Sequence, residues 1–385
     1  MSNIKITTLT PIHVGSGVML QNNTDFVQQQ LDEDNYIGVV DDRRLMEIIG
    51  EKNIDKWVAS INKKENTKDF IERCCSKNIS IEEYSKRLIY CPQKINIQPT
   101  TTLKEYIHDG LGKAYIPGSS IKGAIRTAIL IKEVPNIEDV NNKIDNKRGK
   151  LNAKEIEQEV FGKDPNSDCL RFLHIGDAYF NEGCEDALNM INLNIRERQD
   201  YLDKTKSQII EVITNGEEST FNLTIDLSKN EYIDTYNNEV ENSTKRKNMI
   251  KKLPFNNEKD LFYLINRHTQ KLLESELSIW GDYKEENIVI DYINTIEDIL
   301  NKVKSCDENS CILRIGHASG WRFITGAWSE DVKDDIWDKI CKESRPGDEK
   351  KYKQYIFPKT RRINYNNKEV SLLGFVKLEI NKNHE

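Results

Sequence analysis

The sequence predicts a mixed α+β fold, with strands near both ends of the chain and helices through much of the middle. Apolar and polar residues alternate near the N-terminus, where Ile4 and Ile6 share one face, and again in LLGFVKLEI at 372–380. Residues 115–130 and 228–305 instead show the spacing of helices. The sequence shows no solenoid repeat, and its 385 residues suffice for about two to three domains.

The first quarter is expected to hold three strands followed by helices. The extended runs are 4–9, 25–31 and 36–40. Asp41 and Asp42 can cap a short helix that ends at Gly50. Residues 51–98 are predicted to be mostly helical, with Trp57 and Phe70 in the core.

The segment YIPGSSIKGAIRTAIL (115–130) predicts a turn followed by an amphipathic helix. Pro117 and Gly118 make the turn, and Ser119 or Ser120 can cap the helix. Its apolar stripe consists of Ile121, Ala124, Ile125, Ala128 and Ile129. A helix N-terminus binds phosphate readily, and the cations Lys122 and Arg126 would extend the positive surface. The alternative is an ordinary capped helix whose two cations are solvated.

The rest of the chain alternates between polar insertions and strands. Residues 133–168 are a polar insertion, and strands are expected at 170–180, 208–214 and 220–227. The Asn-Gly pair at 215–216 predicts that the last two strands form a hairpin. Helices follow over 228–305, then a strand at 311–315 and a helical stretch near 329–344.

HVGSG (13–17) and GHASGW (316–321) are two glycine-containing segments that suit a ligand close to the backbone. His13 can act as an acid–base group or stack on a base, and a structural histidine in a tight turn is the alternative. Arg314, Trp321 and Arg322 combine two cations with an aromatic ring, which suits an RNA strand with one stacked base. The alternative is a loop with a core tryptophan.

PKTRR (358–362) places three cations, Lys359, Arg361 and Arg362, within five residues. Such a cluster predicts a phosphate contact, although a solvated basic loop would have the same composition.

Composition and charge narrow the class of protein. The net charge of −7 argues against coating nucleic acid with the whole surface, but it permits a local basic groove. The eight cysteines form no C-x-x-C pair and are expected to be reduced thiols of a cytoplasmic protein. We expect neither a signal peptide nor a membrane span. Without an H-E-x-x-H or G-x-S-x-G pattern, no cofactor, metal or catalytic centre is predicted.

Four segments occur in a characteristic order. They are LTPIHVGSG (9–17), YIPGSSIKGAIRTA (115–128), LRIGHASGW (313–321), and PKTRR (358–362) followed by LLGFVKLEI (372–380). Together they resemble the RAMP superfamily of CRISPR proteins, and more narrowly the fifth Csm subunits of type III-A effector complexes. The resemblance implies two ferredoxin-like (RRM-like) RAMP domains with helical insertions, which we place at 1–185 and 186–385.

The resemblance also implies partners and a role in antiviral defence. The chain would be a non-catalytic RNA-binding subunit that caps the complex at the 3′ end of the guide crRNA. It would contact the backbone and small subunits and target RNA, and would support crRNA maturation by host nucleases.

By matching positions, the resemblance also implies particular RNA-binding residues. These are Gly15, Ser16 and Gly17 in a first glycine loop, Ser119, Ser120, Lys122 and Arg126 on an RNA-facing helix, and Gly374. Gly374 stands where the family has a C-terminal glycine-rich loop, which this chain reduces to one glycine.

Two other functions stay open from the sequence. One is a metal-independent RAMP ribonuclease that processes the crRNA precursor with His13 as general base. The other is a structural adaptor whose basic segments hold protein neighbours. Related backbone subunits cut target RNA with an aspartate in the region of Asp25, but we assign Asp25 no catalytic role because no second acid–base group accompanies it.

Overall fold

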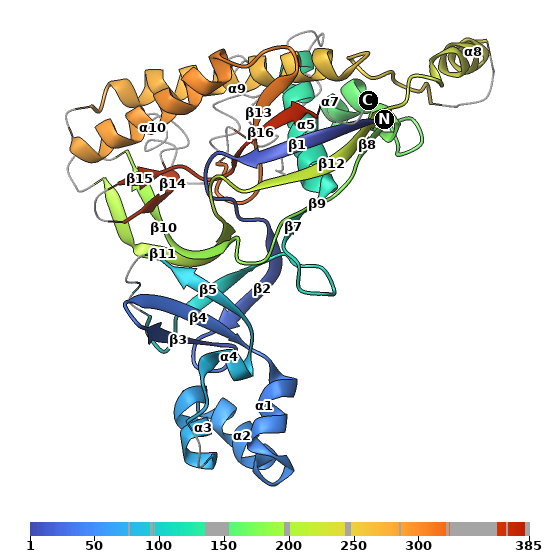
Figure 1. The fold of residues 1–385 in the computed structure, drawn as a ribbon. Coiled ribbons are helices and arrows are strands. Elements are labelled where there is room, and N and C mark those ends of the chain that lie inside the picture. Colours follow the sequence, from blue (N-terminus) through green and yellow to red (C-terminus); the bar gives the residue numbers. More distant parts are fainter. Residues whose placement is uncertain are drawn as a thin grey trace, which may run out of the picture.

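The computed structural model describes residues 1–75, 78–92, 95, 97–134, 154–195, 201–242, 248–284, 286–320, 323, 360–366 and 369–381. In this part of the chain, a five-stranded sheet is built around β1 (Ser2–Thr8). β1 pairs antiparallel with β12 (Glu218–Ile225) on one side and with β16 (Phe375–Ile380) on the other. The outer strands are β8 (Leu173–Ile175) and β13 (Ser310–Arg314). Figure 1 shows β1 and β16, the first and last strands of the described chain, in this sheet.

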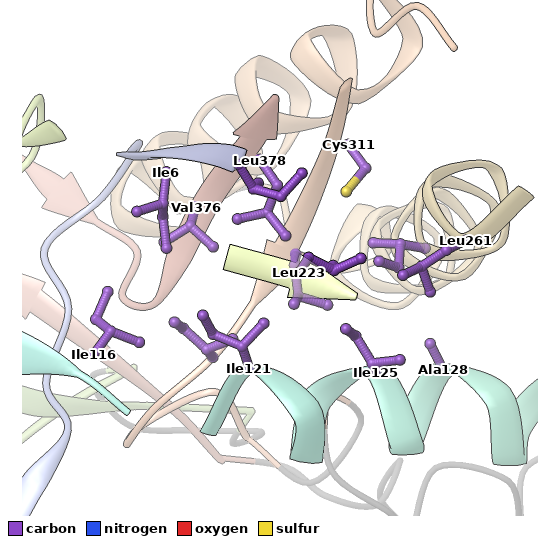
Figure 2. Packing of buried hydrophobic residues seen from close by; sticks show 14 of the residues in the cluster. Ile6, Ile116, Ile121, Ile125, Ala128, Leu223, Leu261, Cys311, Val376 and Leu378 are labelled. Carbon is purple, nitrogen blue, oxygen red and sulfur yellow. The ribbon is translucent and has the colours of Figure 1, made fainter. Parts of the chain in front are cut away.

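The main core lies between this sheet and two helices, α5 (Gly118–Glu133) and α9 (Glu258–Gly281). Ile4 and Ile6 are fully buried because alternate residues of β1 point to the same face. The predicted apolar stripe of α5 faces the sheet, and Figure 2 shows Ile121 and Ile125 pointing toward Leu223. Burying an aliphatic side chain in this way contributes about 1.5–3 kcal/mol, so this layer fixes α5 against the sheet.

A second core lies between α9, α10 (Asn287–Lys304) and strands of both sheets. Figure 1 shows α9 and α10 lying along one side of the molecule. The second sheet has the order β2-β6-β11-β10-β5-β4-β3 in the described residues, with β14 paired to β10 and β15 paired to β14. Its strands are β2 (Gly15–Gln21), β3 (Phe26–Leu31), β4 (Asp34–Val40), β5 (Ser85–Cys91), β6 (Thr102–Tyr106), β10 (Glu185–Asn194), β11 (Leu202–Ile213), β14 (Thr360–Tyr365) and β15 (Val370–Ser371).

A small helical unit packs on the end of this sheet formed by β3 and β4 (Figure 1). It consists of α1 (Asp42–Ile49), η1 (Glu51–Asn53), α2 (Ile54–Asn62), α3 (Thr67–Cys74) and α4 (Ile81–Tyr84). The carboxylate of Asp41 accepts hydrogen bonds from the amides of Arg43 and Arg44, which confirms the predicted helix cap. The prediction that residues 51–98 are mostly helical is wrong over Ser85–Cys91, which form strand β5.

Short elements complete the described chain. They are the ribbon β7 (Tyr115–Ile116) with β9 (Ala178–Tyr179), and the helices α7 (Lys154–Phe161), η4 (Cys169–Phe172) and α8 (Asn230–Glu241). The single strand expected over 170–180 is therefore wrong, because η4, β8 and β9 divide it. No described helix is long and apolar enough to cross a lipid bilayer.

The hairpin predicted at Asn215–Gly216 is wrong. β11 and β12 flank this turn but lie in different sheets. The turn is instead fastened to β1, because Thr8 accepts a hydrogen bond from the Gly216 amide and its hydroxyl donates to the Thr214 carbonyl. Both sheets take strands from each side of residue 185, and the domain boundary there stays a prediction.

Candidate nucleic-acid interface

Three loops from distant parts of the sequence meet where the two sheets join. The amide of His317 donates to the carbonyl of His13 at 2.8 Å, and the amide of Gly374 donates to the carbonyl of Pro11 at 2.9 Å. The amide of Ile315 in turn donates to the carbonyl of Gly374 at 2.8 Å. The glycine segments that the sequence singled out at 13–17 and 316–320 are therefore neighbours, and the loop at 372–375 joins them.

Two glycines allow this close approach. Gly316 and Gly374 have φ values of +80° and +90°, a region that favours glycine. A Cβ on Gly316 would lie 2.5 Å from the carbonyl oxygen of His13, and one on Gly374 would lie 2.3 Å from that of Ile315. Gly374 is buried and serves the packing of the loops, and the contact with RNA that matching positions imply stays a prediction.

His13 lies inside this junction and has no exposed surface. Its Nδ1 donates to the backbone carbonyl of Glu211 at 2.6 Å, since a carbonyl can only accept. Burial lowers the pKa of His13 to about 4, against the opposing effect of that hydrogen bond. The prediction that His13 stacks on a base is wrong, because neighbouring residues such as Tyr106 and His317 pack against its ring.

The accessible part of the junction is a group of three side chains, Lys104, His317 and Arg362, which we call the cationic cluster. Nε2 of His317 lies 3.3 Å from Nζ of Lys104 and 3.1 Å from Nη1 of Arg362. Lysine and arginine only donate, so this nitrogen carries no proton and the ring is neutral. Burial, followed by Lys104, His13 and Arg362, lowers the pKa of His317 to about 4.

The cationic cluster has unbalanced positive charge. Within the described residues, neither Lys104 nor Arg362 has a carboxylate at ion-pair distance. Burial and the charge of Arg362 both lower the pKa of Lys104, as expected when two like charges are crowded together. A bound anion would stabilise two cations this close together, and a phosphate oxygen can accept hydrogen bonds from both side chains.

An apolar side chain borders the cluster. Met19 of β2 lies directly across from Lys104 of β6 and is 37% exposed. Paired residues of neighbouring strands point to the same face of a sheet. A thioether beside two cations offers a nucleic-acid strand both a contact for a base and contacts for its phosphates.

Two arginines predicted to bind RNA lie in the core instead. Arg361 is 7% exposed and makes a bidentate ion pair with Glu276, with both N–O distances at 2.7 Å. Arg314 is 8% exposed, donates to the Leu373 carbonyl and lies over the rings of Phe323 and Phe375, 4.6 and 4.8 Å from their centres. These contacts correct the prediction, because neither guanidinium is free to reach a phosphate.

The predicted RNA-facing helix α5 has partners within the chain for both of its cations. Lys122 donates to the Leu173 carbonyl at 2.8 Å, and burial lowers its pKa. Arg126 pairs with Asp168 and Glu157 and lies 3.7 Å above the ring of Phe161. Their contact with RNA stays a prediction.

The N-terminus of α5 differs from the prediction. The helix begins at Gly118 after Pro117, so neither Ser119 nor Ser120 caps it. The Gly118 amide already donates to the Asp177 carboxylate at 2.7 Å. Asp177 therefore occupies part of the site that the sequence assigned to a phosphate, although Ser119 itself is exposed.

The first glycine loop is accessible. Gly15, Ser16 and Gly17 begin strand β2 and are exposed, and the Ser16 hydroxyl donates to Glu105 at 3.0 Å. Their predicted contact with RNA is compatible with this exposure. Trp321, Arg322 and Lys359 lie outside the described residues.

Asp25 has a structural role in the turn between β2 and β3. Its carboxylate accepts the amide of Gln21 at 2.7 Å, and its own amide donates to the Gln21 carbonyl. Across the described part of the chain, no group of His, Cys, Asp and Glu could hold a metal ion.

Sequence reasoning missed Lys104 as a site residue. A single lysine in an extended run gives no signal by itself, and its importance comes from the distant residues His317 and Arg362. His317 lay in a segment that the sequence did single out, but nothing there distinguished it from its neighbours.

Comparison with known proteins decides the family. The model of the RAMP superfamily matches residues 5–323 of this chain. The chain belongs to the RAMP superfamily. This RAMP protein is 27% identical over 190 residues to the "CRISPR system Cms protein Csm5" of Methanocaldococcus jannaschii, a match that covers 47% of this chain and 43% of that protein. The aligned region is thus less than half of the relative's length.

Solved structures share the fold of this RAMP protein. A chain of the Csm–crRNA–target RNA ternary complex of a type III-A CRISPR-Cas system superposes with a TM-score of 0.69 at 19% identity, covering 98% of this chain and 100% of that one. Csm5 of T. onnurineus superposes with a TM-score of 0.63 at 18% identity, covering 97% and 99% of the two chains. The predicted α+β RAMP fold is confirmed.

Proposed function

We propose that this RAMP protein is a non-catalytic RNA-binding subunit of a type III-A CRISPR (Csm) complex. The observation that carries the proposal is the cationic cluster, where Lys104 and Arg362 lack an acidic partner among the described residues. An RNA phosphate supplies the missing negative charge. The likeness in fold to a chain of a Csm–crRNA–target RNA complex supports RNA as the ligand and the Csm subunits as neighbours.

The position within the complex is part of the proposal. The chain caps the filament at the 3′ end of the guide crRNA, contacts the backbone and small subunits, and supports crRNA maturation by host nucleases. It does so in the cytoplasm as part of an antiviral ribonucleoprotein. The support is the resemblance of its four segments to the fifth Csm subunits and the match to a curated Csm5 protein.

The non-catalytic role is supported by two side chains. His13 has no exposed surface, so it cannot reach a ribose hydroxyl as general base without a rearrangement of three loops. The Asp25 carboxylate holds the amide of Gln21 in a turn. We expect the purified chain to leave crRNA precursor intact, and cleavage that is lost in His13→Ala would contradict this.

The test of RNA binding is the double substitution Lys104→Ala with Arg362→Ala, assayed by fluorescence anisotropy with labelled crRNA at several salt concentrations. The plot of log K against log salt has a negative slope, and the loss of two phosphate contacts to a single strand should make that slope less steep by about 1.4. The loss of affinity should be the same for guides of different sequence. The control is Lys259→Ala with Lys302→Ala, because both lysines are half exposed and pair with surface acids. Equal binding by the wild type and the Lys104/Arg362 variant would refute the proposal.

A further inference from the structure

Leu111 is an exposed apolar residue at the tip of the turn that joins β6 to β7. It is 96% exposed, the highest value among the exposed large hydrophobic residues of the described chain. In Figure 1 the teal turn leading into β7 stands away from the sheets. A leucine this exposed does not stabilise the fold, because its apolar surface is not buried.

The turn is rigid in spite of its exposure. The carboxylate of Asp109 accepts hydrogen bonds from the amides of Leu111 and Lys113, both at 2.9 Å. The Asp109 backbone closes the same turn, since its amide donates to Lys113 and its carbonyl accepts from Gly112. Gly112 supplies the positive φ of +84° that this geometry needs. The backbone therefore presents Leu111 in one conformation, and little entropy is lost when it binds.

An aromatic pair supports the base of the turn. The rings of Tyr115 and Tyr179 stack with centroids 5.2 Å apart, and Tyr179 is 42% exposed. Exposed apolar side chains are thus present at the tip of the turn, with Leu111, and at its base, with Tyr179. Patches of this kind, built on a rigid scaffold, mark interaction sites.

The charges around the patch indicate the class of partner. Burial, followed by the carboxylates of Asp177 and Asp109, raises the pKa of Tyr179, and the ammonium of Lys113 lies 6.0 Å from the centre of that ring. Two carboxylates against one ammonium make the surroundings acidic, which disfavours a phosphate backbone. A protein surface with basic side chains matches this pattern.

We propose that Leu111 is a docking anchor that inserts into an apolar pocket, bordered by basic side chains, on a neighbouring protein subunit. The inference rests on the proposed function, because the neighbour is another subunit of the same Csm complex. Asp109 and Tyr179 contact the border of that pocket, and the cationic cluster, to which the preceding strand β6 contributes Lys104, is left free for RNA.

The test is reconstitution of the full chain with a Csm complex that lacks it and carries crRNA, followed by mass photometry across a range of concentrations. Leu111→Ala is expected to weaken association roughly ten- to hundred-fold, because the complex loses the free energy of burying one leucine side chain. Leu111→Met should bind nearly as well as the wild type, because it restores the apolar contact. Val58→Ala on α2, at a site 51% exposed, is the matched control and should leave association unchanged.

A photoreactive benzophenone amino acid in place of Leu111 identifies what the turn touches. Crosslinking within the complex is expected to give an adduct with a protein subunit. An RNA adduct, or no adduct, would overturn the proposal. If Leu111→Ala associates as the wild type does, the docking proposal fails and the function stands. If the wild-type chain neither joins the complex nor binds crRNA, the proposed function itself fails.

Discussion

The backbone amide of His317 donates a hydrogen bond to the backbone carbonyl of His13 across 304 positions of sequence. This bond joins the first glycine segment to the last one and sets the position of the His317 ring. Lys104 and Arg362 both approach the far nitrogen of that ring. The geometry of the cationic cluster therefore depends on how closely two backbones can approach.

A methyl group at Gly316 should separate the two backbones. Gly316→Ala combines a positive φ with a 2.5 Å contact to the His13 carbonyl oxygen, and we expect a loss of about 1–3 kcal/mol in the free energy of unfolding. Gly320→Ala has the positive φ but open space around it, so about 1 kcal/mol is expected. Gly110→Ala has neither and should be neutral. Urea unfolding of the three variants tests this order, and equal losses at Gly316 and Gly320 would argue against the contact.

Arg361 and Arg362 are adjacent on β14, but substituting them should affect different properties. The Arg361 substitution should lower stability, and the Arg362 substitution should weaken RNA binding. Arg361→Met removes the cation that balances the buried carboxylate of Glu276, at an expected cost of about 3–5 kcal/mol in unfolding free energy. Arg362 lies on the exposed face of the strand. Arg362→Met should therefore change the free energy of unfolding by less than about 0.5 kcal/mol while weakening RNA binding. Thermal unfolding and anisotropy on both variants check this. Normal stability of Arg361→Met would refute the structural role.

Arg126 should matter for stability through its three contacts within the chain. Arg126→Ala loses the ion pairs to Asp168 and Glu157 and the contact with the Phe161 ring, and an unfolding cost of about 1–2 kcal/mol is expected. Arg126→Lys should restore only part of it, because lysine cannot make both ion pairs over the ring. If Arg126→Ala keeps its stability but loses RNA affinity in a salt-dependent way, the contact implied by matching positions is correct.

Low pH should lower the free energy of unfolding, because the buried ring of His13 is neutral in the folded chain. Burial holds its pKa at about 4, below the ordinary value of 6.5, so the unfolded chain binds the proton more readily. The stability that the neutral ring contributes is present above pH 6.5 and is lost as the pH falls toward 4. His13 accounts for about 1–2 kcal/mol of the stability lost between pH 7 and pH 5 by urea unfolding, and His13→Gln should remove that part of the loss. The part due to His317, whose pKa burial also lowers to about 4, should remain. The exposed His174→Gln is the control, and the same pH dependence in both variants would contradict the assignment.

The elements that sequence patterns predicted well are those whose signal is local. The cap at Asp41, the apolar stripe of α5, and the alternation in β1 and β16 depend on neighbouring residues. The Asn215–Gly216 turn shows the limit of such signals. Its composition is that of a hairpin, yet hydrogen bonds to Thr8 direct the two strands into different sheets.

The candidate site shows the same limit. The three cations of PKTRR (358–362) were expected to make a phosphate contact as a cluster, but successive residues of a strand point to opposite faces. Arg361 therefore enters the core while Arg362 reaches His317. Lys104 could not be selected from the sequence, because its role depends on residues more than two hundred positions away.

The central place of β1 in its sheet has a consequence for synthesis on the ribosome. β1 is made before both of its partners, and of these β16, with Ile380 opposite Ile4, is made after β12. The edge of β1 that pairs with β16 therefore stays open in the nascent chain until β16 has been made, and a chaperone bound to residues 2–8 would shield it. The same pairing brings Asn3 and Asn381 into hydrogen-bond contact, so a circular permutant that joins these ends and opens a surface loop should fold and make β1 and β16 as one local hairpin.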